Sequence, residues 1–119
     1  MIAMARPAAL LALLIAGGVY WQVVCQLDRV AEPWDAARYW TLWYPVSFVL
    51  AAVAGAAMPK RAWLAGIIVT AAQLPVMWAN TGIPALWMLG VAMCAVLAVP
   101  VSGVAALAGW TATRARRAL

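Results

Sequence analysis

Four long runs of apolar residues, separated by short polar or basic connections, restrict what this chain can fold into. The runs cover about residues 7–26, 41–58, 62–80 and 84–110. Each is close to or longer than the roughly 20 residues that an α-helix needs to cross a bilayer. Because 69% of the residues are hydrophobic and only 9% are charged, the chain lacks the polar surface of a soluble domain. The sequence therefore predicts an all-α, integral membrane four-helix bundle that forms a single domain over residues 1–119.

The basic residues are distributed unevenly over the connections between these runs. Six of the eight fall on one side of the predicted membrane: Arg6, Lys60, Arg61, Arg114, Arg116 and Arg117. The other two lie in the connection 27–40. Cytoplasmic loops carry the excess of lysine and arginine, so we expect both termini in the cytoplasm and 27–40 as an outward loop. Short turns after the second and third runs predict antiparallel, up-down packing of the helices that they join. We expect a multi-pass protein of a bacterial inner (cytoplasmic) membrane.

Several kinds of chemistry are excluded by composition. The chain has no histidine, which removes imidazole metal ligands, histidine-ligated haem and Ser-His-Asp catalysis. Its two cysteines, Cys25 and Cys94, have no zinc-site spacing. The net charge of +5 is explained by membrane topology, and no basic patch alternates with polar or aromatic residues as in a nucleic-acid interface. We therefore predict no cofactor, no metal and no nucleic-acid partner.

All three carboxylates of the chain lie in the outward loop, at Asp28, Glu32 and Asp35. They would have to supply the acid, base or cation ligand of any lipid-active enzyme. Arg29 and Arg38 nearly neutralise them, however, and a divalent cation needs more oxygen ligands at tighter spacing. We interpret the loop as solvated surface and the protein as not an enzyme.

Gln73 is the one strongly polar side chain deep within a predicted span, and Pro75 frees a backbone carbonyl nearby. Two interpretations stay open. Gln73 forms an interhelical hydrogen bond, with a serine or threonine as its partner, or it lines a polar path beside a locally broken helix. The residues considered for these two roles are Ser47, Thr70, Gln73, Asn80 and Ser102.

Small residues recur at intervals of four on the predicted helices. The longest such stripe, on the last run, is Gly90, Cys94, Ala98, Ser102 and Ala106, and a shorter one on the first run is Ala8, Ala12 and Ala16. Membrane helices associate by close packing, which small residues permit, so we predict the longer stripe as a helix-packing face. Pro100, inside the same run, predicts a kink.

The aromatic residues gather toward the predicted outer side of the membrane. The tryptophans of this outer-face aromatic cluster are Trp21, Trp34, Trp40, Trp43, Trp78 and Trp87, with Tyr39 and Tyr44 between them. Amphipathic rings of this kind form belts at membrane interfaces. The cluster is either such an anchor or a surface for a ligand or partner.

The leading functional hypothesis is a self-assembling protein or an accessory subunit of a membrane complex, with the lipid bilayer and a second copy or another membrane protein as partners. The alternative is a small homo-oligomeric transporter, flippase or channel with a path near Gln73. In length and helix number the chain is similar to the small multidrug resistance exporters. Those carry an essential glutamate in their first helix, whereas no titratable carboxylate, lysine or arginine lies within any span here, which weakens proton-coupled transport.

Overall fold

The computed structural model describes residues 2–83, 85 and 87–118, with side chains from Pro7 onward. Its elements are α1 (Ile2–Asp28), η1 (Pro33–Asp35), the π-helical turn η2 (Tyr39–Trp43), α2 (Tyr44–Ala57), η3 (Pro59–Arg61), α3 (Ala62–Ala71), α4 (Gln73–Thr81) and α5 (Trp87–Ala118). Every element in these ranges is helical, which confirms the all-α prediction. Pro84, the expected start of the last run, lies outside the described residues.

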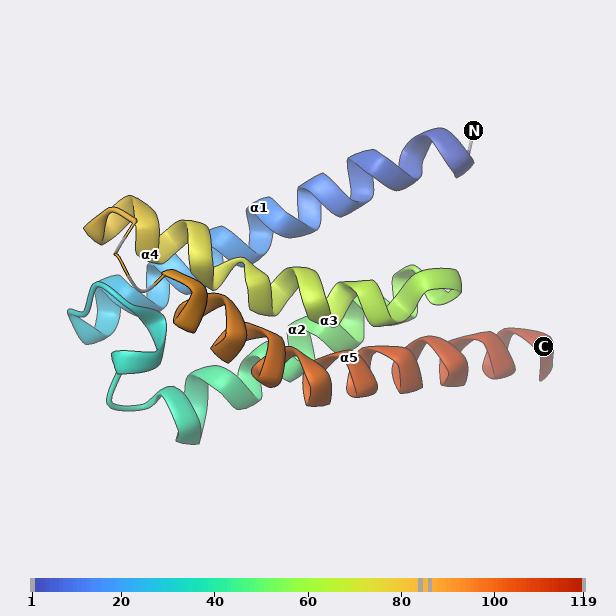
Figure 1. Ribbon diagram of the computed structural model, residues 1–119. Coiled ribbons are helices and arrows are strands. Elements are labelled where there is room, and N and C mark those ends of the chain that lie inside the picture. The colour runs from blue at the N-terminus through green and yellow to red at the C-terminus, as the bar shows by residue number, and fades with distance from the viewer. Residues whose placement is uncertain (1, 84, 86, 119) are drawn as a thin grey trace.

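Four helical segments are long and apolar enough to cross a membrane. They are Pro7–Asp35, Tyr39–Ala57, Pro59–Thr81 and Trp87–Ala118. The last of them extends as one helix to Ala118, so the basic residues Arg114–Arg117 form its final turns instead of a separate tail. Pro100 lies inside α5, which stays a single helix but changes direction part-way along its length (Figure 1).

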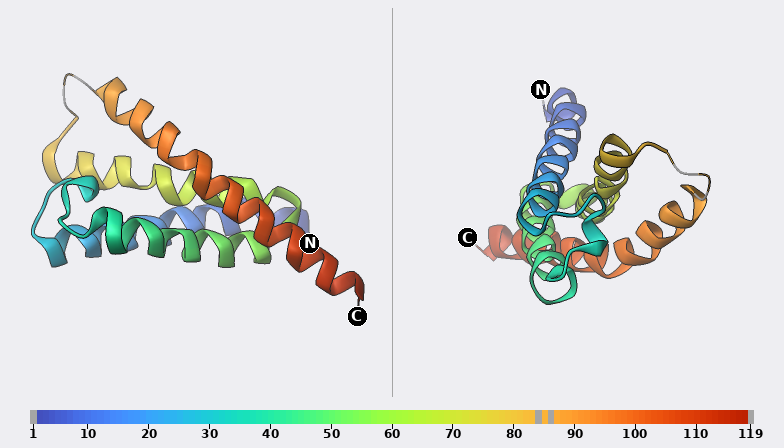
Figure 2. Two further views of the ribbon diagram at one scale, coloured as in Figure 1. Left: turned by 90° about the horizontal axis from the view of Figure 1, so that it is seen from below. Right: turned by 90° about the vertical axis from the view of Figure 1, so that its left-hand side faces the viewer.

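The two chain ends lie at the same end of the molecule as η3, whereas η1 and the end of α4 lie at the opposite end (Figure 1). α5 packs along α2 and α3, and α1 packs mainly on α3 and α4. The beginning of α1 projects away from the other helices (Figures 1 and 2). In agreement with this, Pro7, Ala8, Leu11 and Ala12 are exposed, and Leu13 is the first buried residue among the side chains of α1 described from Pro7 onward. The start of α1 is therefore less enclosed than the second half of the same helix.

Two glycines allow α5 to approach its neighbours closely. A Cβ atom added to Gly66 of α3 would fall on the backbone of Ser102, and one added to Gly55 of α2 would fall on the backbone of Ala105. Such close helix contact replaces, in lipid, the hydrophobic driving force that holds helices together in water. The α2, α3 and α5 helices thus form the tightly packed part of the bundle.

The third span is interrupted at Ala72, where α3 ends and α4 begins. Proline has no amide hydrogen, so Pro75 cannot donate to the carbonyl of Ala71, and the break occurs at this point. A break inside a membrane requires other donors for the freed carbonyls. Side chains that donate to carbonyls in the last turn of α3, just before the break, define the candidate site.

Candidate functional site

Gln73 begins α4 and is completely buried. Its amide group is used at both ends: the Tyr39 hydroxyl donates to Gln73 Oε1 at 3.0 Å, and Gln73 Nε2 donates to the Thr70 carbonyl at 3.1 Å. The first bond joins the turn η2 to α4, and the second satisfies a backbone carbonyl in the last turn of α3. Gln73 therefore has a structural partner for each of its polar atoms.

Trp21 of α1 supplies a second donor to the end of α3. Its indole Nε1 donates to the Val69 carbonyl at 2.8 Å, and the side chain is fully buried. The last carbonyls of an α-helix have no partner within the helix. Trp21 and Gln73 together satisfy two of them, at Val69 and Thr70, in the last turn of α3 before the break.

Three buried aromatic rings, those of Trp21, Tyr39 and Tyr44, pack in sequence, and we call them the aromatic stack. Trp21 and Tyr39 lie 5.6 Å apart at 28°, and Tyr39 and Tyr44 lie 5.5 Å apart at 16°. Offset stacking of this kind contributes about 0.5–1.5 kcal/mol per pair beyond simple burial. The Tyr44 hydroxyl donates to the Leu97 carbonyl at 2.6 Å, so the stack connects α1, η2, α2 and α5.

Sequence reasoning did not find Tyr39 and Tyr44, because both follow a polar loop and were assigned to the interface belt. In the structure the π-helical turn η2 directs Tyr39 inward, beside Gln73, and leaves its neighbour Trp40 exposed. The sequence feature that could have identified Tyr39 is Gln73, because an amide inside a span needs a hydrogen-bond partner. A tyrosine hydroxyl at the start of an adjacent span is a suitable donor.

The residues proposed for a polar path are distributed over several environments. The Ser47 hydroxyl donates to the Tyr44 carbonyl within its own helix, at 2.5 Å. Asn80 is exposed near the end of α4 and donates to the Ala31 carbonyl at 3.1 Å. Within the described residues, the hydroxyls of Thr70 and Ser102 are buried and have no hydrogen-bond partner. Of these four residues, Thr70 alone is hydrogen-bonded to Gln73 within the described structure, through its backbone carbonyl.

Asp28 differs from the expectation of a solvated acidic loop. Arg38 Nη2 donates to Asp28 Oδ1 at 2.6 Å, Trp43 Nε1 donates to Oδ2 at 2.9 Å, and the Asp28 side chain is 6% exposed. The Arg38 guanidinium also lies over the Trp43 ring at 5.0 Å. Asp28 therefore closes the loop 27–40 onto the start of the second span.

The other two carboxylates do not join Asp28 in a site. Glu32 accepts a bond from Trp34 Nε1 at 2.8 Å, and Asp35 is exposed. No group of three or more histidine, cysteine, aspartate or glutamate side chains that could hold a metal occurs among residues 2–83, 85 and 87–118. Asp28 and Glu32 are thus engaged in contacts within the loop, whereas Asp35 is exposed.

The predicted packing stripe on α5 follows the contact face for only part of its length. Cys94 and Ala98 are buried, Gly90 and Ser102 are half-buried, and Ala106 is exposed. An interval of four exceeds the 3.6 residues of a helical turn, so the stripe rotates away from the contact face. The residues that α5 buries are Cys94, Leu97, Ala98, Val101, Ala105 and Gly109.

The six tryptophans of the outer-face aromatic cluster also fall into different environments. Trp21 is buried in the aromatic stack, whereas Trp40 and Trp87 are exposed by 59% and 45%. The other three, Trp34, Trp43 and Trp78, are half-buried. Only part of the cluster is thus available to lipid.

The chain matches no protein-family model, no curated protein and no solved structure. Function is therefore inferred from the contacts described above.

The bond between Tyr39 and Gln73 leads to a testable prediction. Tyr39→Phe leaves Gln73 Oε1 without its donor, and Gln73→Leu leaves the Tyr39 hydroxyl and the Thr70 carbonyl without their partner. Each substitution is expected to destabilise the protein by about 1–2 kcal/mol. The double variant removes both groups and is expected to lose less than the sum of the two single losses, by about 1 kcal/mol. The free energy of unfolding in mixed detergent micelles is measured for the wild type, the two single variants and the double variant. Strictly additive losses would contradict the bond.

Proposed function

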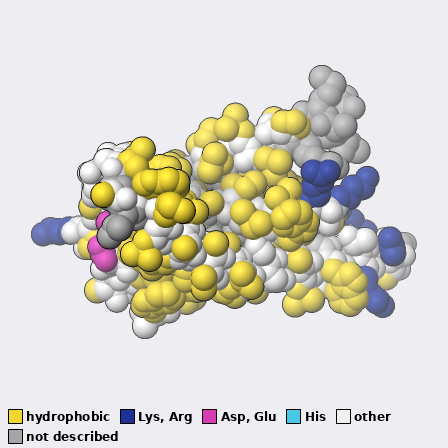
Figure 3. Space-filling model, in the orientation of Figure 1, with side chains coloured by type: hydrophobic (Ala, Val, Ile, Leu, Met, Phe, Trp, Pro, Cys, Tyr) yellow, Lys and Arg dark blue, Asp and Glu magenta, His cyan; other side chains and the backbone are white. Residues whose placement is uncertain are grey.

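We propose that this chain is a small polytopic protein of a bacterial inner membrane that acts as a self-assembling or accessory subunit of a membrane complex and has no enzymatic activity. We place both termini in the cytoplasm, with the four spans crossing in alternating directions. The charge distribution supports this orientation. In the view of Figure 3, most of the visible lysine and arginine side chains lie at the end that carries the chain termini. The acidic side chains lie at the opposite end, from which basic side-chain atoms also project.

The observation that carries the proposal is the outward face of α1. One side of this helix is buried against the bundle through Leu13, Gly17, Trp21 and Val24. The opposite side exposes the small residues Ala8, Ala12 and Ala16, flanked by Ile15 and Val19, which are each 59% exposed. In lipid, small residues between larger apolar ones permit close approach of another helix. α1 thus has one face for the bundle and a second face suited to a partner helix.

The interior of the bundle gives less support to the transport alternative. A path beside Gln73 would pass the amide that Tyr39 and the Thr70 carbonyl already engage. Tyr39 and Trp21, both fully buried, fill the space next to it. Substrate would have to break these bonds and displace two rings, which makes association the better-supported function.

Substitution on the outward face of α1 tests the proposal. The double variant Ala12→Leu/Ala16→Leu adds bulk to the exposed side of α1 and is expected to weaken association about tenfold, equivalent to about 1.4 kcal/mol. Energy transfer between labelled chains in liposomes measures self-association, and cross-linking in native membranes followed by co-purification measures binding to another protein.

Ala95→Leu provides the matched control, since Ala95 is an exposed alanine on α5. It is expected to leave association unchanged. A wild-type chain that stays monomeric and cross-links to nothing would refute the proposed function. Association that persists equally in the α1 double variant and in the control would exclude this face.

A further inference from the structure

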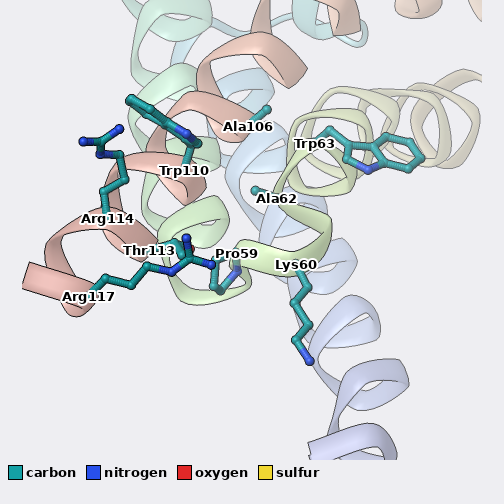
Figure 4. A pocket seen from close by; sticks show the side chains of 9 residues that line it. All are labelled: Pro59, Lys60, Ala62, Trp63, Ala106, Trp110, Thr113, Arg114 and Arg117. Atoms are coloured by element: carbon teal, nitrogen blue, oxygen red, sulfur yellow. The ribbon is translucent and has the colours of Figure 1, made fainter.

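A pocket of about 260 Å³ lies at the end of the molecule opposite the aromatic stack. It is formed by η3, the first turn of α3 and the last turns of α5 (Figure 4). Its lining includes Lys60, Arg114 and Arg117, together with the hydroxyl-bearing Thr113 and two tryptophans, Trp63 and Trp110. We call it the basic end pocket.

The charge in this pocket is of one sign. The three acidic side chains of the chain all lie between residues 28 and 35, in the loop at the opposite end of the bundle. In Figure 4 the Arg117 side chain extends along Thr113 toward Pro59, and Arg114 lies beside Trp110, with its guanidinium carbon 5.0 Å from the ring centroid. The chain's own acidic side chains thus lie too far away to neutralise these cations, and a bound anion would be attracted.

The two tryptophans place the pocket at the level of a lipid head group. Trp63 and Trp110 are 50% and 57% exposed and lie on opposite sides of the pocket (Figure 4). Exposed indoles at the ends of spanning helices occupy the boundary between hydrocarbon and head groups. Between the rings, the small side chains of Ala62 and Ala106 line the pocket. An occupant would therefore have an anionic group beside the cations and apolar chains below the indoles.

We propose that the basic end pocket binds the phosphate-bearing head group of an anionic phospholipid. Arg117 and Arg114 provide charged donors for the phosphate oxygens, Thr113 provides a neutral donor, and Trp63 and Trp110 contact the start of the acyl chains. Pockets for whole small molecules usually measure about 300–1,000 Å³. A cavity of about 260 Å³ is suited to a head group whose acyl chains remain in the bilayer.

Native mass spectrometry of the protein released from nanodiscs tests the proposal. Wild-type protein is expected to retain phosphatidylglycerol and to release phosphatidylcholine. Each positive charge near an anionic lipid contributes about fivefold in affinity, so Arg114→Gln/Arg117→Gln is expected to bind phosphatidylglycerol about 25-fold more weakly.

Arg116→Gln is the matched control. Arg116 lies between the two arginines in sequence, but its guanidinium donates toward the Ala56 carbonyl at 3.5 Å and does not line the pocket. It is expected to retain phosphatidylglycerol as wild type does. Equal retention by the double variant and by Arg116→Gln would overturn the proposal, as would equal retention of the two lipids by wild type. Displacement of the lipid by millimolar inorganic phosphate would identify a site for a soluble anion instead and would likewise overturn it. Circular dichroism of each variant checks that the helices are intact.

Discussion

Gly66→Leu is expected to destabilise the bundle by about 3 kcal/mol or more, the largest loss of any single substitution considered for this chain. A Cβ atom at this position falls on backbone atoms of α5, 2.6 Å from the Val101 carbonyl carbon. Backbone of a packed helix cannot move aside as a flexible side chain does, so α3 and α5 must separate. Unfolding in mixed micelles and the elution volume of the purified protein report the loss.

Gly103→Leu is the control for this substitution. Gly103 directly follows Ser102 on α5, but a Cβ atom there meets no atom within 4 Å. Leucine also favours a helix over glycine by up to about 1 kcal/mol. Gly103→Leu is therefore expected to keep or slightly raise the free energy of unfolding. Equal losses for the two variants would show that close contact at Gly66 does not hold the helices together.

Trp21→Ala is expected to cost about 3 kcal/mol, the second largest effect. The substitution opens a cavity at a fully buried position, removes one ring of the aromatic stack and leaves the Val69 carbonyl without its indole donor. Thermal unfolding in detergent, followed by near-ultraviolet circular dichroism, measures both the stability and the loss of ordered ring packing.

Two further variants separate the causes. Trp21→Phe keeps an aromatic ring beside Tyr39 but removes the bond to Val69, and a loss of about 1 kcal/mol is expected. Trp87→Ala removes a tryptophan that is 45% exposed on α5, and a loss below about 0.5 kcal/mol is expected. If Trp87→Ala and Trp21→Ala were equally destabilising, the stack would have no special role.

The helical spans were predictable because length and apolar content alone decide whether a helix suits a bilayer. Pro75 also indicated where the third span is weakened, since proline removes a donor wherever it lies in a helix. The path of the loop 27–40 was not predictable. It depends on Asp28, whose bonds to Arg38 and Trp43 join residues 10 and 15 positions apart.

The candidate site was predictable in part. Gln73 was identified because a buried amide in a membrane requires partners. Tyr39 was not identified, because the composition around it is that of an interface belt and its inward direction comes from the π-helical turn η2. On α5, the strict interval of four predicted a packing face that includes Ala106. The buried face instead continues through Val101, Ala105 and Gly109. Packing follows the helical turn, and repetition of small residues alone does not reveal it.

The interrupted third span has a consequence for how the polypeptide matures. Val69 receives its indole donor from α1, which the ribosome completes before α3. A third span that entered the bilayer without the first beside it would keep a bare carbonyl in hydrocarbon, at a cost of several kcal/mol. Pairing of α1 with α3 therefore has a lower free energy than an arrangement in which the two are apart. This difference exists before α5 has been synthesised.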